Sequence, residues 1–245
     1  MKVLLMTDLH YTEGLISENT RMCYLSLDKV KKISPLFPEC DLCFFLGDLV
    51  NGTEDEAFDL HNLNEVKRLL DRFHFHYVLG NHDAFSFDKD RIMPVVPGIG
   101  AVDSFTVNGI TFITLDANFT EDSLSYSRTH GEWTNACIPS AQQNWLKDQL
   151  QQCEKAVILC HQNLHGSNKE NPHMIRNAAQ IRKILEESGK VTTVFQGHDH
   201  KGNDCTVNGI RYHTLKGMCE KRNIPWCIAE IDNNTIQIRD FLLEL

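Results

Sequence analysis

Side chains that can bind metal ions recur at five points of this 245-residue chain, each soon after a short apolar run. They are aspartate, histidine and asparagine, and histidine is abundant, with 12 copies in the chain. Neutral imidazole binds transition metals and also transfers protons near neutral pH. Imidazole nitrogens mixed with carboxylate and amide oxygens suit Mn²⁺, Fe, Zn²⁺ or Co²⁺ better than Ca²⁺, which prefers oxygen alone. The candidate ligands are Asp8, His10, Asp48, Asn81, His161, His198 and His200.

Seven ligands are too many for one ion of coordination number four to six, but they suit two ions that share a carboxylate. Two such ions can activate a water molecule and neutralise the charge that grows on a phosphoryl group. Glycines stand just before three of the ligand segments, at Gly47, Gly80 and Gly197. We expect them to allow tight turns and close approach of the backbone to the site.

Short apolar runs with β-branched and aromatic residues predict the strands that must position these ligands. The runs are Val3–Met6, Leu42–Leu46, His76–Leu79, Ile110–Leu115, Ala156–Cys160, Val191–Phe195 and Trp226–Ile231. Five of them carry candidate ligands at or just beyond their carboxyl ends, which is the edge where open α/β sheets bind ligands. One such junction is weak evidence, because an isolated polar residue after a strand is usually structural. Five junctions of the same kind predict a common site.

Helix start signals lie between these runs. Capping boxes are predicted at Thr53 and Glu56 before Ala57–Phe73, at Ser140 and Gln143 before Trp145–Leu150, and at Asn177 and Gln180 before Ile181–Glu187, which Gly189 can end. A further helix is predicted over Asn19–Ile33. Cys40 and Cys43 form a lone C-x-x-C pair, and we expect Cys43 to face the core of a strand rather than bind zinc.

One short repeat occurs 100 residues apart, as Thr106–Ile110 and Thr206–Ile210. Its Asn-Gly pair is typical of a type I′ hairpin turn. The repeat suggests two related halves, each a mixed sheet ending in a hairpin, although a recurring turn sequence alone would also explain it. A third hairpin is expected over Ile228–Ile238. Together these elements predict one α/β domain over residues 1–245, a two-sheet β-sandwich flanked by helices.

The ordered motifs resemble the calcineurin-like metallophosphoesterase superfamily. They read Asp8-Leu9-His10, Gly47-Asp48-Leu49-Val50-Asn51, Gly80-Asn81-His82-Asp83, a lone His161, and Gly197-His198-Asp199-His200. The resemblance extends from residue 8 to about residue 220 and implies the metallophosphoesterase fold, a double β-sandwich. It also implies that Asp8, His10, Asp48 and His200 hold one metal ion. Asp48, Asn81, His161 and His198 then hold the other, and Asp48 bridges the two.

The resemblance further implies direct attack by a bridging hydroxide, without a phosphoenzyme. His82, beside a ligand but outside the ligand set, is the candidate general acid. Some family members have aspartate at the position of Asn51, where it orients that histidine and keeps it protonated. Asn51 can orient the ring but lacks the charge. Asp83 is expected either to hold the loop or to cap a helix.

The substrate class is harder to predict from the sequence. The segments Leu115–Ala117, Gly131–Trp133 and Gln143–Leu146 resemble small bacterial phosphodiesterases and ADP-ribose/CDP-alcohol pyrophosphatases, and Trp145 and Leu146 are expected to be core. We therefore expect a small, nucleotide-like phosphoester substrate with a diester, pyrophosphate or monoester bond. The long polar loop Asn118–Ile138 is expected to cover the site. The cationic candidates for phosphate binding are Arg21, Arg128, His130, Lys221 and Arg222.

Composition limits the alternatives. The net charge of −9 argues against a duplex nucleic acid as partner, which leaves a nuclease as a secondary hypothesis. A catalytically silent scaffold is another, although no ligand position is missing. The chain shows no membrane-spanning run, and its nine cysteines without an apolar signal segment predict a cytoplasmic protein with reduced thiols. The oligomeric state is left open.

Overall fold

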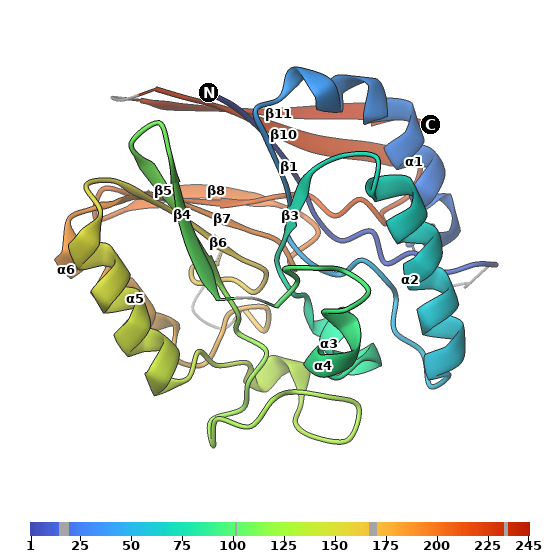
Figure 1. The fold of residues 1–245 in the computed structure, drawn as a ribbon, viewed down its shortest axis with the longest axis horizontal. Helices are drawn as coiled ribbons and strands as arrows, with labels where there is room; N and C mark the ends of the chain where they lie inside the picture. The colour runs from blue at the N-terminus through green and yellow to red at the C-terminus, as the bar shows by residue number, and fades with distance from the viewer. Residues whose placement is uncertain (15–19, 101, 167–170, 233–234) are drawn as a thin grey trace.

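Two β-sheets form the centre of the molecule in the computed structural model, which describes residues 1–14, 20–100, 102–166, 171–232 and 235–245 (Figure 1). The first sheet has the strand order β11-β10-β1-β2-β3. Its strands are β1 (Lys2–Met6), β2 (Leu42–Phe45), β3 (Phe75–Tyr77), β10 (Asn223–Ile231) and β11 (Ile236–Glu244). The second has the order β4-β5-β6-β7-β9-β8. Its strands are β4 (Asp103–Val107), β5 (Ile110–Leu115), β6 (Ala156–Cys160), β7 (Val191–Gln196), β8 (Asn203–Val207) and β9 (Ile210–Thr214).

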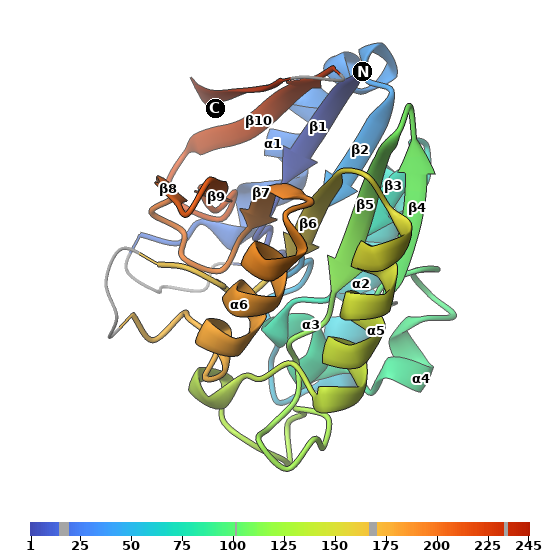
Figure 2. The same cartoon turned by 90° about the vertical axis from the view of Figure 1, so that its left-hand side faces the viewer.

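Helices cover the outer face of each sheet (Figures 1 and 2). Residues of α1 (Ser26–Ile33) and α2 (Glu56–Leu70) share a buried cluster with the first sheet, and residues of α5 (Ser140–Gln152) and α6 (Ala178–Ser188) share another with the second. A third cluster, which includes Leu5, Phe44 and Phe195, lies between the sheets. Two short helices, α3 (Asn81–Ser86) and α4 (Lys89–Ile92), follow β3. The predicted two-sheet sandwich flanked by helices is confirmed.

The predicted Asn-Gly hairpins are both present, but the prediction that they belong to two related halves of the chain is wrong. Asn108, Gly109, Asn208 and Gly209 all have positive φ, as a type I′ turn requires. The turns join β4 to β5 and β8 to β9, and these two hairpins form opposite edges of the same sheet. The sequences recur because tight turns impose the same backbone demand twice. The third hairpin, β10–β11, is in the other sheet.

The predicted helices exist, but their caps differ. Asp55, rather than Thr53, caps α2, because its carboxylate accepts from the backbone N–H groups of Ala57 and Phe58. Helix α5 begins at Ser140 itself, and no side chain caps it. The Asn177 side chain bonds to the backbone of Ile138 instead of capping α6.

Two of three further sequence predictions are confirmed. Gly189 ends α6 with a φ of 64°, as predicted. Helix α1 begins at Ser26 after a 3₁₀ turn over Cys23–Leu25, and the predicted start at Asn19 lies outside the described residues. Cys43 is buried in the core cluster of the first sheet, as predicted.

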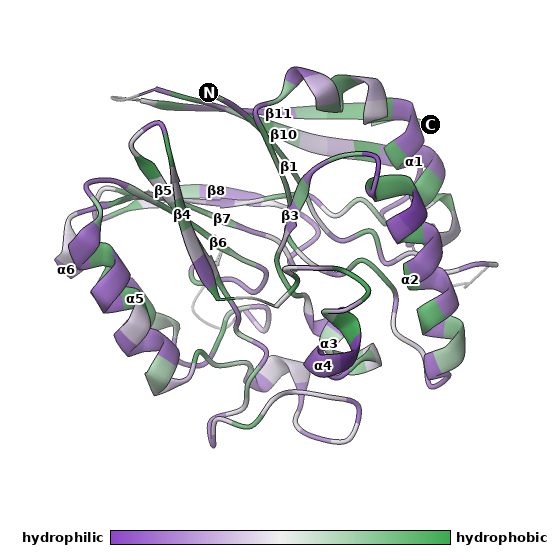
Figure 3. Ribbon diagram, in the orientation of Figure 1, coloured by the Kyte–Doolittle hydropathy of each residue, from purple (hydrophilic) through white to green (hydrophobic). Residues whose placement is uncertain are grey.

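The surface pattern is that of amphipathic helices on a buried sheet. Figure 3 shows helices α2, α5 and α6 with hydrophilic and hydrophobic residues interleaved along their length, whereas the central strands are largely hydrophobic. Within the described parts of the chain, no helix is both long enough and apolar enough to cross a membrane.

Lys29 is a buried cation that joins α1 to the segment after β9. Its ammonium group donates to the carbonyl of Met218 at 2.6 Å, and the side chain is fully buried. Burial lowers the pKa of Lys29 to about 8, because a charged ammonium loses its hydration there. The folded state therefore binds this proton less tightly than the unfolded chain does.

This shift predicts a pH-dependent stability difference between the wild type and Lys29→Met. Between pH 8 and the ordinary lysine pKa of 10.5, the unfolded wild type binds more protons than the folded one. The free energy of unfolding of the wild type should therefore rise relative to that of the variant across this window. Urea unfolding of both proteins at a series of pH values measures the difference. Parallel curves would show that Lys29 does not titrate with a lowered pKa.

Candidate metal centre

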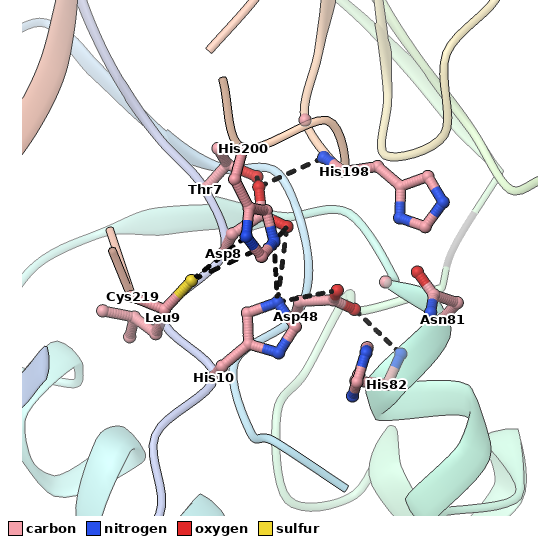
Figure 4. Close-up of polar contacts among 12 residues, drawn as sticks. Thr7, Asp8, Leu9, His10, Asp48, Asn81, His82, His198, His200 and Cys219 are labelled. Atoms are coloured by element: carbon pink, nitrogen blue, oxygen red, sulfur yellow. Dashed lines mark hydrogen bonds and ion pairs between the residues drawn. The ribbon is translucent and has the colours of Figure 1, made fainter. Parts of the chain in front are cut away.

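All seven predicted ligand residues lie close to one another at the carboxyl ends of the strands. Asp8 and His10 follow β1, Asp48 follows β2, and Asn81 begins α3 shortly after β3. His161 follows β6 in the second sheet, and two more histidines follow β7. Strands β1, β2 and β3 are parallel, as are β6 and β7, so their carboxyl ends meet at one edge of the sandwich. Figure 4 shows most of these side chains directed toward one another.

Four ligand atoms surround a first point. His10 Nε2 lies 3.1 Å from His200 Nε2, 3.3 Å from Asp48 Oδ2 and 3.6 Å from Asp8 Oδ1. His200 Nε2 lies 3.4 Å from the same Asp8 oxygen. A tetrahedral ion with bonds near 2.0–2.1 Å separates its ligands by about 3.3 Å. The four atoms therefore have the spacing of a metal cage.

A second group shares one oxygen with the first. Asp48 Oδ2 lies 3.2 Å from His161 Nε2, which lies 3.1 Å from Asn81 Oδ1. Asp48, His161 and His198 present ligand atoms within 4.8 Å of one another. The same Asp48 oxygen faces both groups, which is the position required of a bridging carboxylate.

Unpaired buried atoms indicate what these groups are built to hold. Asp8 Oδ1, Asp48 Oδ2 and His198 Nε2 are buried and have no hydrogen-bond partner. A buried polar atom without a partner is costly, and a charged one is more so. Metal ions at the two points would satisfy all three atoms. The residues present therefore fit a dinuclear centre.

Four of the candidate ligands adopt a left-handed backbone conformation that residues other than glycine seldom adopt. Asp8, His10, Asp48 and His198 have φ between 45° and 67°. They are four of the eight non-glycine residues with positive φ in the described part of the chain. Such strain costs on the order of 1–3 kcal/mol per residue and concentrates at functional sites. Hydrogen bonds such as Asp8 N–H to the Gly47 carbonyl, at 3.0 Å, hold these turns in place.

The carboxylates and imidazoles alter one another's pKa values in the metal-free protein. Burial alone would raise the pKa of Asp8 and Asp48, but the facing histidines outweigh it and lower both well below the usual range. Burial lowers the pKa of His10 to about 3 and that of His198 well below its ordinary value. These two imidazoles are therefore neutral at neutral pH, the form that ligates a metal ion.

Asp83, in α3, holds the loop that carries Asp48 and also caps the start of its own helix. Its carboxylate accepts from the backbone N–H groups of Asp48 at 2.9 Å and Leu49 at 2.8 Å, and from that of Gly80 at 3.1 Å. The last bond also completes the N-terminus of α3. The two roles that the sequence left open for Asp83 are therefore both present.

His82 lies beside the first group, but Asn51 orients it differently from the prediction. The imidazole Nδ1 of His82 donates to the backbone carbonyl of Asn51, not to its side chain. The Asn51 side chain instead faces the thiol of Cys23, 4.0 Å away. The ring of His82 packs edge-on against that of His10, with centroids 4.4 Å apart. The orientation of His82 therefore depends on the position of the Asn51 backbone carbonyl, and the type of side chain at residue 51 does not predict this.

Sequence reasoning missed three residues at the rim of this site. Glu220 Oε1 lies 2.9 Å from Nδ1 of His200, and this hydrogen bond lowers the pKa of Glu220 to about 2. A carboxylate on the far nitrogen fixes the ring of a metal-binding histidine. Trp133 and His173 lie against the ring of His198, with centroids 5.2 and 4.9 Å away. No spacing in the sequence links these residues to the ligands they contact.

The peripheral candidates are mostly engaged elsewhere. Arg128 donates to the Thr53 carbonyl at 2.6 Å, which attaches the loop over residues 118–138 to the start of α2. Arg222 donates to the carbonyl of Leu245, and His130 faces Asp122 at 3.8 Å. Lys221 is exposed, and only its backbone N–H, which donates to the Thr20 carbonyl, has a described hydrogen bond.

Two other residues differ in their distance from the centre. Arg21 forms a β-bridge with Glu220, the residue that contacts His200, and so lies near the metal centre. His165 contacts Cys205 at 3.3 Å and the ring of Tyr212.

A family model for calcineurin-like phosphoesterases matches residues 1–202, most of the chain. The protein belongs to the calcineurin-like phosphoesterase family. It is thus a metal-dependent phosphoric ester hydrolase, and its family uses a dinuclear metal centre. No match was found among curated proteins.

Solved structures show the same fold. A dimetal phosphatase from Danio rerio superposes with a TM-score of 0.82 at 18% identity, covering 99% of this chain and 98% of that one. Phosphopantetheinyl hydrolase from Mycobacterium tuberculosis gives 0.53 at 13% identity, covering 89% and 90%. GAP50, the anchor in the inner membrane complex of Plasmodium, gives 0.63 at 15% identity, covering 100% and 88%. At these sequence identities, the similarity to the three structures shows only that this phosphoesterase has the same fold.

The close approach at Gly80 predicts that a single methyl group disrupts the centre. A Cβ at Gly80 would lie 2.1 Å from both the backbone nitrogen and Oδ1 of Asp48, so the bridging residue would have to move. Gly80→Ala should lose most bound metal and activity, as measured by metal analysis after dialysis. Gly109→Ala, strained by a φ of 77° but open in space, should lower stability and keep the metal content. Equal metal content in both variants would refute the tight-approach argument.

Proposed function

We propose that this phosphoesterase hydrolyses diester or pyrophosphate bonds of small nucleotide-like substrates. The observation that carries the proposal is an aromatic wall next to the second ligand group. Trp133 and His173 are half-buried, lie with ring centroids 5.6 Å apart, and both contact His198. A planar base next to a phosphate held at the centre would meet these rings. Base stacking on aromatic side chains is favourable for every base.

The seven candidate ligands are proposed to hold two ions, with Mn, Fe or Zn favoured by the mixed oxygen and nitrogen donors. When bound, such ions supply positive charge for the phosphoryl oxygens and lower the pKa of water. The chain itself supplies the geometry. Asp83 holds the loop of Asp48, and Glu220 fixes the ring of His200, so both neighbours limit movement of the ligands.

His82 is proposed to protonate the leaving oxygen. Its ring stands at the edge of the first group, and its Nδ1 donates to the Asn51 carbonyl. Nε2 is therefore the nitrogen that remains to serve the substrate. In the imidazolium form this nitrogen can donate a proton to a departing alkoxide.

We also propose that residues 1–245 form one domain in the cytoplasm. Pairing of β10 with β1 joins the two ends of the chain in one sheet, which supports the single domain. All nine cysteines are free, which supports a reducing compartment.

His82→Ala should keep the metal and lose activity selectively. We expect about a 10²- to 10⁴-fold loss of kcat on esters with alkyl leaving groups, because those need a proton. Bis-p-nitrophenyl phosphate, whose leaving group is stable as an anion, should be affected much less. Asn51→Ala is the matched control, because the bond to His82 comes from its backbone. Equal loss on both substrates, or equal loss in both variants, would contradict the acid role.

Trp133→Ala should weaken binding of substrates that carry a base. Loss of about 1–3 kcal/mol of stacking corresponds to roughly a 5- to 150-fold increase in KM for ADP-ribose. A glycerophosphodiester without a base is the reference substrate, and its KM should change little. Steady-state kinetics on both substrates test this, with Trp145→Phe as a control at a half-buried residue of α5 that packs against the core of the second sheet. A KM that rises equally for both substrates would refute the base-binding wall.

A further inference from the structure

Three potential metal ligands, with a further carboxylate behind one of them, meet between the two sheets, on strands rather than at the strand ends that carry the proposed dinuclear centre. Cys227 lies directly opposite Asp240 in the β10–β11 pair, and His213 lies directly opposite Asp204 in the β8–β9 pair. Directly opposite residues of paired strands point to the same face of a sheet. Each sheet therefore presents one such pair to the space between them.

The contacts show that the two pairs face each other. His213 Nε2 lies 3.0 Å from Asp240 Oδ1, which joins the two sheets. A ring nitrogen of His213, the thiol of Cys227 and an Asp240 oxygen lie within 4.8 Å of one another. Cys227 and His213 are each 1% exposed, so neither is a surface residue. The Asp240 side chain is 58% exposed, which leaves a route from solvent.

The imidazole is held as a metal ligand would be. Its second nitrogen, Nδ1, is buried without a hydrogen bond and lies 3.5 Å from Asp204 Oδ2. Asp204 is itself fixed by Arg211, whose Nε donates to it at 2.9 Å. A carboxylate behind one nitrogen of a histidine orients the other nitrogen toward a metal.

We propose that His213 Nε2, Cys227 Sγ and Asp240 Oδ1 form a third metal site, which takes a thiophilic divalent ion such as Zn²⁺. One thiolate, one imidazole and one carboxylate are zinc ligands, and the exposed side of Asp240 leaves the fourth position to water. The site is separate from the proposed hydrolytic function, since none of its residues belongs to the seven candidate ligands.

The position of the cluster gives the site a structural role. Strands β8 and β11 are edge strands of their respective sheets. An ion at this point joins the β8–β9 hairpin to the β10–β11 hairpin, so that the two edges cannot separate. An ion bound only by the folded state stabilises that state in proportion to the logarithm of its free concentration. Burial and the neighbouring Asp240 raise the pKa of the Cys227 thiol, so metal binding must release its proton.

Cobalt titration distinguishes this site from the dinuclear centre, whose seven predicted ligands include no cysteine and where Cys219 is the one thiol grouped with His10 and His200 among the described residues. Metal-free protein titrated with Co²⁺ should develop a thiolate-to-cobalt charge-transfer absorption band. Cys227→Ala should abolish the band. Cys219→Ala is the matched control, because Cys219 is the thiol beside His200, at 3.4 Å from its Nδ1. Absence of the band, or its loss in Cys219→Ala with retention in Cys227→Ala, overturns the proposal.

Zinc stoichiometry gives a second measurement that does not depend on cobalt. Wild-type protein dialysed against excess Zn²⁺ should retain three ions per chain, and Cys227→Ala should retain two with unchanged phosphoesterase activity. Asp240→Ala, at an exposed side chain, provides a variant that keeps the core intact if Cys227→Ala does not fold, and it should also retain two. Two ions in the wild type, or three in a folded variant of this cluster, overturn the proposal.

Discussion

A carboxylate buried where the two sheets meet is the constraint on which the site depends. Asp48 is 1% exposed, and its Oδ2 faces imidazoles from β1 and β6 at 3.3 and 3.2 Å. An ionised carboxylate in such surroundings costs several kcal/mol unless positive charge compensates it. Histidines compensate in the metal-free protein, and cations would do so in the loaded one. Both arrangements require that side chains from different sheets converge on one oxygen.

The fold provides this convergence through parallel strands and tight turns. Because β1 and β2 are parallel neighbours, Asp8 and Asp48 leave the sheet side by side, and the His10 N–H donates to the Asp48 carbonyl at 2.9 Å. Positive φ at the ligands turns the chain sharply enough to aim each side chain back at the centre. The strain this entails is offset by backbone hydrogen bonds and by the carboxylate of Asp83. Strained backbone and unpaired polar atoms thus coincide at the same residues, as expected where function outweighs local stability.

The surroundings of the candidate ligands come from other segments of the chain. Glu220 reaches His200 from the segment after β9, and Lys29 anchors that segment through the carbonyl of Met218. Trp133 comes from the long loop that Arg128 attaches to the start of α2. Side chains that position ligands, and those that border the substrate, therefore come from segments that the ligand motifs do not include. The ligand motifs therefore indicate the reaction class, and residues outside them border the substrate.

The sequence alone predicted the strands and the end of the sheets where aspartate, histidine and asparagine side chains gather, because the spacing of apolar residues, apolar content and residue chemistry are local properties. It also predicted the hairpin turns, since Asn-Gly has its own backbone preference. Only the tertiary structure decided that Thr106–Ile110 and Thr206–Ile210 lie in one sheet, because strand order depends on long-range pairing. Likewise, only the tertiary structure showed that Asn51 acts through its carbonyl, that Glu220 supports His200, and that Cys227 and Asp240 face His213. These contacts join residues far apart in the chain, and their energies depend on burial and distance, which no local pattern encodes.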